Sequence, residues 1–226
     1  MRKVYGVAIN DADYAVDPCI KVNGKVVHTN PCPYYRRWLC ILGRCFSKQA
    51  AKLQPSYAGN SVCEEWLIFS NFKKWMEKQD WKGNVLDKDL LVYGNSIYSP
   101  ETCVFIPAWL NNLFLDAKAK RGELPLGVHF QKYNDTNKYN YSISKPYIAS
   151  IRKDNKLYHL GSFETKESAH LAWQKEKLKY VEEKCKIFIG QDLYYKGILP
   201  RINRLKEDII NNRITVNLHH NRGGER

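Results

Sequence analysis

The sequence contains no continuous run of about eighteen apolar residues, the length that a membrane-spanning helix needs. The first residues, MRKVYGVAINDADY, carry two basic side chains, but neither an apolar stretch nor a small-residue cleavage site follows them. We therefore expect no secretion signal, no membrane partner and a cytoplasmic location.

The sequence also lacks any Cys-x-x-Cys pair, although it contains seven cysteines. An odd number of thiols without paired spacing does not favour a disulfide framework, and structural zinc sites usually draw on closely spaced ligands. We expect reduced, partly buried thiols. The alternative is a zinc ion held by Cys45, Cys63 and Cys103.

Acidic residues are few beside basic ones: 23 Asp and Glu stand against 36 Lys and Arg, which gives a net charge of +13. Phosphate backbones attract such a surplus, and the release of their counterions adds to the affinity. The charge and the many aromatic residues predict a nucleic acid as partner, and nothing indicates an obligate protein partner. The alternative is a basic protein whose charge only keeps it soluble.

Strand and helix patterns alternate in the first half of the chain. β-branched residues and the turn pair Asn23-Gly24 predict short strands within residues 1–30. Apolar residues at helical spacing predict helices over 34–46 and 64–79, and Pro and Gly mark a loop at 52–60 between them.

The second half predicts further strands and helices. Residues 85–114 show a strand, a turn, a second extended piece and a short helix from about Pro107, which is a ββα outline. A charged linker follows at 117–125. Three strand patterns then precede a helix that Thr165 caps, and another helix spans 198–212. The three strands are expected at 126–132, 145–154 and 156–163.

Four short motifs follow one another between residues 126 and 182. They are Leu126-Gly127-Val128, Tyr147-Ile148-Ala149-Ser150-Ile151-Arg152, His159-Leu160-Gly161-Ser162-Phe163 and Thr165-x-Glu167-x-Ala169. Apart from a longer first turn rich in Asn and Tyr, this order resembles the AP2-type DNA-binding domain. The resemblance implies a three-stranded sheet with a helix on one face and the DNA major groove against the other.

Strand alternation agrees with this arrangement. Ala149 and Ile151 can face the helix, which leaves Ser150 and Arg152 on the open face. Arg152 is the candidate for guanine readout through a two-pronged contact. The alternative is a solvated basic sheet edge. The full set of expected DNA-binding residues is His129, Gln131, Lys132, Ser150, Arg152, Lys153 and His159.

A second string of residues lies between 34 and 113. It consists of Trp38, Leu42, Arg44, Cys45, Val62, Cys63, Glu65, Trp66, Asp87-Lys88, Gly94-Asn95, Tyr98, Pro100, Cys103 and Asn111. This string is similar to the phage and homing HNH-type endonucleases. The resemblance implies that Asp87 is a ligand of a divalent metal ion, and magnesium suits such an oxygen ligand.

The string departs from the family at two positions. Lys88 occupies the position of the general-base His, and Thr102 corresponds to an Asn near the helix start. Lysine is a poor base near neutrality unless burial or a cation lowers its pKa. Alternatively, Asp89 orients the water, or Lys88 stabilises phosphate charge. Glu64 and Glu65 are further oxygen ligands in reach, and a surface turn of mixed charge is the plain alternative. The expected catalytic residues are Asp87, Lys88, Asp89 and Asn111.

The sequence thus predicts an α+β protein. A ββα-metal, HNH-like nuclease core with N-terminal strands is expected over 1–118, an AP2-like domain over 119–185, and a helical, basic tail over 186–226. The expected function is magnesium-dependent cutting or nicking of double-stranded DNA by a homing-endonuclease-like, phage-type enzyme in the host cytoplasm. The alternatives are a non-catalytic AP2-like regulator with a degenerate nuclease core, and an RNA-binding protein.

Overall fold

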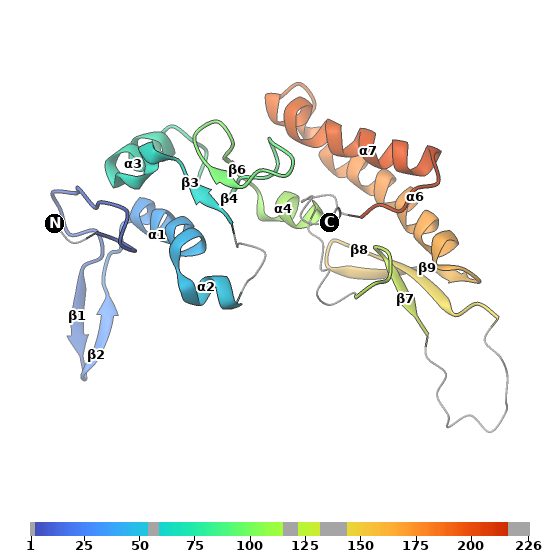
Figure 1. Ribbon diagram of the computed structural model, residues 1–226, viewed down its shortest axis with the longest axis horizontal. Helices are drawn as coiled ribbons and strands as arrows, with labels where there is room; N and C mark the ends of the chain where they lie inside the picture. The colour runs from blue at the N-terminus through green and yellow to red at the C-terminus, as the bar shows by residue number, and fades with distance from the viewer. Residues whose placement is uncertain (1–2, 54–58, 115–121, 132–143, 217–226) are drawn as a thin grey trace. The chain divides into compact units, whose positions relative to one another are not determined.

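The computed structural model describes residues 3–53, 59–114, 122–131 and 144–216. The chain divides into two compact units, Met1–Asn111 and Asn112–Arg226, each of which combines helices with small sheets (Figure 1). The α+β class is therefore confirmed. The predicted boundary at residue 118, most of the linker at 117–125 and Lys132 lie outside the described residues.

The N-terminal part of the first unit contains a hairpin. Strands β1 (Cys19–Val22) and β2 (Lys25–His28) pair antiparallel around Asn23 and Gly24, whose φ angles are 50° and 77°. Positive φ at both positions is what the predicted two-residue turn requires. The strand expected within residues 4–9 does not form, since that segment makes only isolated bridges, Val4 with Ala8 and Ile9 with Ile68.

Two helices follow the hairpin. Helix α1 (Pro33–Phe46) confirms the predicted helix and buries Trp38, Ile41 and Leu42. Helix α2 (Lys48–Leu53) occupies the start of the predicted loop. The core of this unit is aromatic, because Trp38, Trp66, Phe69 and Phe72 are all almost fully buried.

The helix predicted over 64–79 is broken at Ile68. A 3-10 helix, η2 (Glu64–Leu67), precedes helix α3 (Phe69–Glu77). The cause is Ile9: its N–H donates to Leu67 O at 2.7 Å, and its carbonyl accepts from Phe69 N at 3.0 Å. These contacts hold Ile68 in an extended conformation with ψ near 123°, and an α-helix cannot continue through such a residue.

Short strands and a helix form over residues 85–114, but the strand that pairs with β4 is not the one predicted. Strand β4 (Val85–Asp87) pairs antiparallel with β6 (Val104–Ile106), and helix α4 (Ala108–Phe114) begins two residues later. The extended piece between them, β5 (Ile97–Tyr98), pairs in parallel with β3 (Ser61–Val62) instead of with β4. Asp87 is thereby held at the end of β4, opposite Val104.

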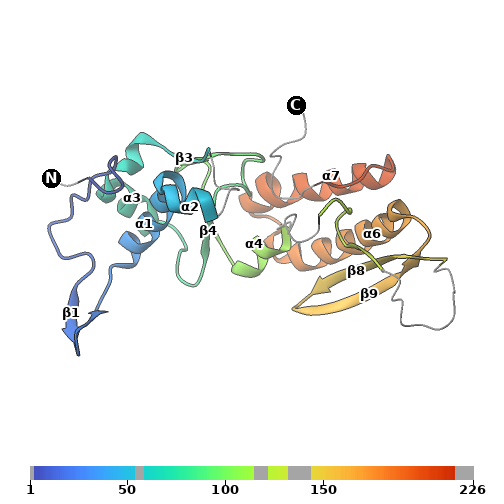
Figure 2. The same cartoon turned by 60° about the horizontal axis from the view of Figure 1, so that its bottom comes forward.

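The second unit has three layers. Strands β7 (Val128–Phe130), β8 (Tyr147–Lys153) and β9 (Lys156–Phe163) form an antiparallel sheet in the order β7-β8-β9. Helix α6 (Lys166–Cys185) covers one face of this sheet, and α7 (Leu199–Ile210) lies along the other side of α6 (Figures 1 and 2). Residues 186–216 of the tail that was expected as a separate region thus pack within this unit. Two short helices, η3 (Lys186–Phe188) and η4 (Tyr194–Ile198), connect α6 to α7.

Close packing of sheet and helix depends on Gly127. This residue has φ of 74°, and a Cβ there would overlap the indole of Trp173 on α6. Only glycine combines a left-handed conformation with so close an approach. Thr165 caps α6 as predicted, because its hydroxyl oxygen accepts a hydrogen bond from Ser168 N at 3.2 Å.

The side of α6 that faces away from the sheet carries buried polar residues. His170 Nδ1 lies 2.8 Å from Leu126 O, and His170 Nε2 accepts from Thr215 N at 2.9 Å. Gln174 donates to Thr215 Oγ1 at 2.9 Å, and that hydroxyl donates to Asp208 Oδ2 at 2.9 Å. These bonds tie the segment after α7 to α6, and they give each of these four buried side chains a hydrogen-bond partner.

Lys177 is the buried cation of this face. Its ammonium donates to Leu113 O at 2.5 Å, and burial lowers the pKa of this lysine from 10.5 to about 8. Desolvation disfavours the charged form, and one carbonyl does not compensate for the lost hydration.

We expect the free energy of unfolding to rise between pH 8 and 10.5, because the unfolded chain retains the Lys177 proton that the folded chain has lost. In Lys177→Met, this rise should be smaller by roughly 3 kcal/mol. Urea unfolding across this pH range would measure it. Lys179→Met, an exposed change on the same helix, should keep the wild-type slope. Equal slopes in all three proteins would contradict the assignment.

Candidate functional site

The sheet of the second unit presents one face that α6 does not cover. Strand register places His129, Ile148 and Ser162 side by side on this face. It also places Ser150 beside His159, and Arg152 beside Leu157. The opposite face buries Val128, Ala149 and Ile151 against the helix side, as strand alternation predicts.

A bulge in β9 adjusts which residues reach the open face. The register shifts between Ala149 and Ser150, so that Ala149 pairs with Gly161 and Ser150 pairs with His159. Leu160 is the extra residue. Gly161 has φ of 135°, a conformation that side-chain-bearing residues rarely adopt, and it thereby accommodates the bulge.

Two of the expected DNA-binding residues contact each other. His129 Nε2 lies 2.9 Å from Ser150 Oγ, and Ser150 is only 7% exposed. Ser150 is therefore too buried to contact DNA extensively, and its hydroxyl instead positions the His129 ring. His129, Gln131 and His159 are exposed.

Arg152 is exposed on the open face, near the turn between β8 and β9. One guanidinium nitrogen, Nη1, donates to Asn155 O at 2.9 Å, and this hydrogen bond restrains the guanidinium group. Arginine has further N–H groups in the same plane, and these can make a two-pronged contact. Strands β7, β8 and β9 contain no Asp or Glu, so positive charge on this face is not neutralised from within the sheet.

Lys153 differs from the expectation. Its ammonium pairs with Glu176 of α6 and lies 5.6 Å from the ring centres of both Tyr158 and Tyr180. It follows Arg152 in the strand and therefore points to the helix side of the sheet. The carboxylate and the aromatic rings already use its charge, so it belongs to the packing of α6.

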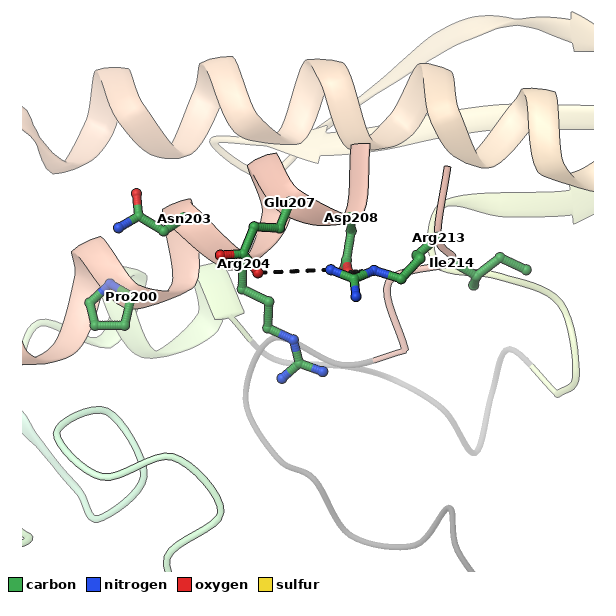
Figure 3. A pocket seen from close by; sticks show the side chains of 7 residues that line it. All are labelled: Pro200, Asn203, Arg204, Glu207, Asp208, Arg213 and Ile214. Atoms are coloured by element: carbon green, nitrogen blue, oxygen red, sulfur yellow. Dashed lines mark ion pairs between the residues drawn. The ribbon is translucent and has the colours of Figure 1, made fainter. Parts of the chain in front are cut away.

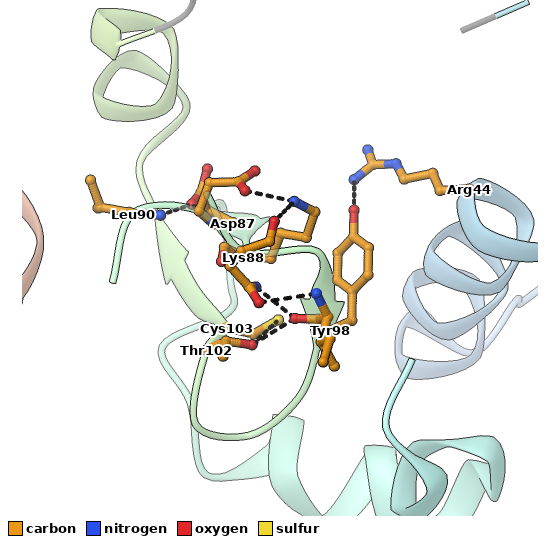
Figure 4. A network of polar contacts seen from close by, with 10 residues as sticks. Arg44, Asp87, Lys88, Leu90, Tyr98, Thr102 and Cys103 are labelled. Atoms are coloured by element: carbon orange, nitrogen blue, oxygen red, sulfur yellow. Dashed lines mark hydrogen bonds and ion pairs between the residues drawn. The ribbon is translucent and has the colours of Figure 1, made fainter. Parts of the chain in front are cut away.

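A second candidate site lies in the first unit, where Asp87, Lys88 and Asp89 are consecutive and buried. Asp87 Oδ1 accepts from Asp89 N at 2.8 Å and from Leu90 N at 2.6 Å (Figure 4). These bonds hold the chain in a tight turn directly after β4. The cluster is therefore an ordered, buried arrangement and not a surface turn of mixed charge.

Lys88 supplies the positive charge of this cluster. It is 3% exposed, and its ammonium donates to Asp89 Oδ1 at 2.6 Å and to Asn95 O at 2.7 Å (Figure 4). The Tyr98 ring centre lies 5.8 Å from the same nitrogen. The Asp89 carboxylate and the Asn95 carbonyl thus hold the end of the Lys88 side chain in place through charge-assisted hydrogen bonds.

Hydrogen bonds from the side chains of Asn95 and Thr102 hold the loop around the cluster in place. Asn95 donates to Lys88 O at 2.8 Å and to Ile97 O at 2.7 Å. Thr102 donates to Ile97 O at 2.7 Å and lies 3.1 Å from Ser99 Oγ. Thr102, which stands where the similar family has Asn, therefore supports the loop.

The other expected residues are not brought into the cluster. Asn111 lies half-buried on α4, and among the described residues its side chain makes no hydrogen bond to Asp87, Lys88 or Asp89. Glu64 and Glu65 are exposed on η2. In the part of the chain that the structure describes, no group of three or more His, Cys, Asp or Glu side chains could hold a metal ion.

The donor chemistry at Asp87 nevertheless suits magnesium. This ion prefers oxygen ligands and is commonly bound by one or two carboxylates together with water and a substrate phosphate. Asp87 and Asp89 provide two buried carboxylates in one turn. Asp87 would be the principal ligand, since Lys88 already compensates Asp89.

The three cysteines considered for zinc are buried or half-buried thiols. Burial raises the pKa of Cys45 to about 11 and that of Cys103 to about 12, and it raises the pKa of Cys63. Desolvation favours the uncharged thiol, whereas zinc binds the thiolate.

A pocket of about 550 Å³ lies along α7 and the segment that follows it (Figure 3). Arg204 and Arg213 line it together with Glu207 and Asp208. Arg213 forms ion pairs with both carboxylates, at 3.8 Å and 3.4 Å. Sequence patterns did not indicate this pocket, because its residues converge only when the segment after α7 folds back.

No protein family, no curated protein and no solved structure matches the chain. Within the described residues, no helix combines the length and the apolar character that crossing a membrane requires.

We expect Lys88→Met to destabilise the first unit by about 3–5 kcal/mol, because it removes the ammonium that pairs with the buried Asp89 carboxylate at 2.6 Å. The double variant Lys88→Met with Asp89→Leu should recover most of this loss. Urea unfolding of both variants, with the exposed Lys78→Met as control, would measure the difference. A loss in Lys88→Met no larger than that in Lys78→Met would show that the pair is not buried in solution.

Proposed function

We propose that the protein binds double-stranded DNA through the open face of the sheet β7-β8-β9. The observation that carries the proposal is the composition of this face: Arg152, His129, Gln131 and His159 are exposed on it, and its strands contain no acidic residue. A sheet backed by one helix and open on its other face suits the AP2-like manner of binding.

The side chains of this face can recognise both parts of a duplex. Arginine contacts guanine O6 and N7, and glutamine contacts adenine N6 and N7, through paired hydrogen bonds in the major groove. Lys145 and Lys156 are exposed at strand ends, and their charge at the edge of the sheet would attract phosphates. The net charge of +13 adds a sequence-independent attraction to any polyanion.

We expect Arg152→Gln to weaken binding to a selected duplex site about tenfold or more, because one paired contact to guanine is lost. Fluorescence anisotropy at fixed salt would measure the dissociation constant. Lys179→Gln removes the same charge from the helix behind the sheet and should change binding by much less. Equal losses in both variants would show that charge alone, and not the open face, determines affinity.

Competition with an RNA duplex tests whether the protein prefers DNA or RNA. The major groove of RNA is deep and narrow, and strands cannot enter it as they enter that of DNA. Displacement of labelled DNA by double-stranded RNA at equal concentration and salt would favour the RNA-binding alternative over the proposed function.

We further propose, as a second function, that the first unit cuts or nicks the bound DNA with magnesium, as an HNH-like core does. The buried cluster of Asp87, Lys88 and Asp89 at the end of β4, with α4 after β6, favours this function. Bound at Asp87, magnesium would supply positive charge to the phosphate and its leaving oxygen. Lys88 would add positive charge there, and its ion pair with Asp89 makes it a charge-stabilising group and not the base.

We expect wild-type protein to nick supercoiled DNA with magnesium, and Asp87→Asn to lose nicking while retaining DNA affinity, because the amide removes the charge that holds the ion. Gel analysis of plasmid topology would measure this. Asp13→Asn, an exposed change in the same unit, should retain full activity.

Asp87 also accepts two backbone hydrogen bonds, so unfolding of each variant must be measured beside nicking. Binding without nicking by folded wild-type protein would favour the non-catalytic regulator.

A further inference from the structure

The hairpin of β1 and β2 stands out from its unit with both faces exposed. Figure 1 shows the hairpin projecting from the rest of its unit. All eight strand residues are exposed, and Val26, for example, is 56% exposed. At its base, Thr29 donates to Pro18 O through its N–H at 2.9 Å and its hydroxyl at 3.1 Å. Next to this pair, His28 Nδ1 lies 2.8 Å from Asp17 Oδ1. The hairpin is therefore fixed at one end.

An isolated two-stranded ribbon is marginally stable in water, and exposed β-branched residues on both faces add to the cost. Such a ribbon is suited to a partner that covers it. The sequence of residues 18–29 contains Lys21 and Lys25 but no Asp or Glu, so that partner is expected to be negatively charged.

The register distributes these features over both faces. Lys21 stands opposite Val26, and Val22 stands opposite Lys25, so each face combines one ammonium with apolar side chains. A duplex groove has the matching pattern: phosphates line its two rims, and thymine methyl groups project from its floor. A two-stranded ribbon also has the width that the major groove admits.

We propose that the hairpin Cys19–His28 enters the major groove of duplex DNA, as a contact separate from the open sheet face. Lys21 and Lys25, one on each face, bind phosphates on the two rims, and the apolar side chains of the face that meets the groove floor contact the base edges. This inference rests on the proposed DNA-binding function, and it assigns a DNA contact to the first unit that does not depend on cleavage.

The test compares the salt dependence of binding to a mixed-sequence DNA duplex. Each lysine–phosphate contact contributes about 0.9 to the slope of log affinity against log salt concentration. The full-length double variant K21Q/K25Q should therefore lower the slope by about two. The control K78Q/K82Q removes two exposed lysines of the same unit outside the hairpin and should lower it by less than one.

A second measurement reports the groove. Wild-type protein should protect guanine N7 from methylation at positions that V26S/V27S leaves reactive, because N7 lies in the major groove. Equal slopes in K21Q/K25Q and K78Q/K82Q, or unchanged N7 protection in V26S/V27S, would overturn the inference while DNA binding itself stands. Absence of salt-dependent DNA binding by wild-type protein would instead overturn the proposed function and this inference together.

Discussion

One helix that is buried on two sides organises the second unit. Helix α6 presents small and aromatic residues to the sheet, where Trp173 fits beneath Gly127, and polar residues to the segment after α7. Because α6 covers one face of a three-stranded sheet and α7 packs on α6, no helix in the described part of this unit covers the other face of the sheet. The open face on which the proposed DNA binding depends follows from this order of layers.

The first unit handles charge in a different way. Its acidic turn is buried, and its cation is a lysine of the same turn, so the charges of Lys88 and Asp89 compensate each other at 2.6 Å. Such a pair is costly to separate and preserves the local shape. This local structure suits either an active nuclease core or a non-catalytic scaffold with the same fold. The two alternatives differ only in whether Asp87 binds a metal ion.

The sequence predicted those elements that local patterns determine. Helix α1, the hairpin turn at Asn23-Gly24 and the Thr165 cap depend on neighbours within a few residues, and all three are confirmed. Distant partners decided the rest. Ile9 interrupts the helix at Ile68, and Glu176 of α6 provides the ion-pair partner of Lys153. The buried polar contacts of α6 could not be predicted from local pattern either, because Thr215 lies 45 residues beyond His170.

The bulge at Leu160 has a consequence for how β9 is laid out. His159 and Ser162 are three positions apart, an odd spacing that would direct them to opposite sides of a regular strand. The additional residue shifts the alternation by one, and both then share a side with Ser150 and Ile148. Deleting Leu160 would leave His159 and Ser162 two positions apart, so a regular strand would keep both on the open side. Straightening the strand with Leu160 still in place would instead turn His159, Leu157 and the rest of that half-strand over, exchanging the exposed set of side chains for the packed one.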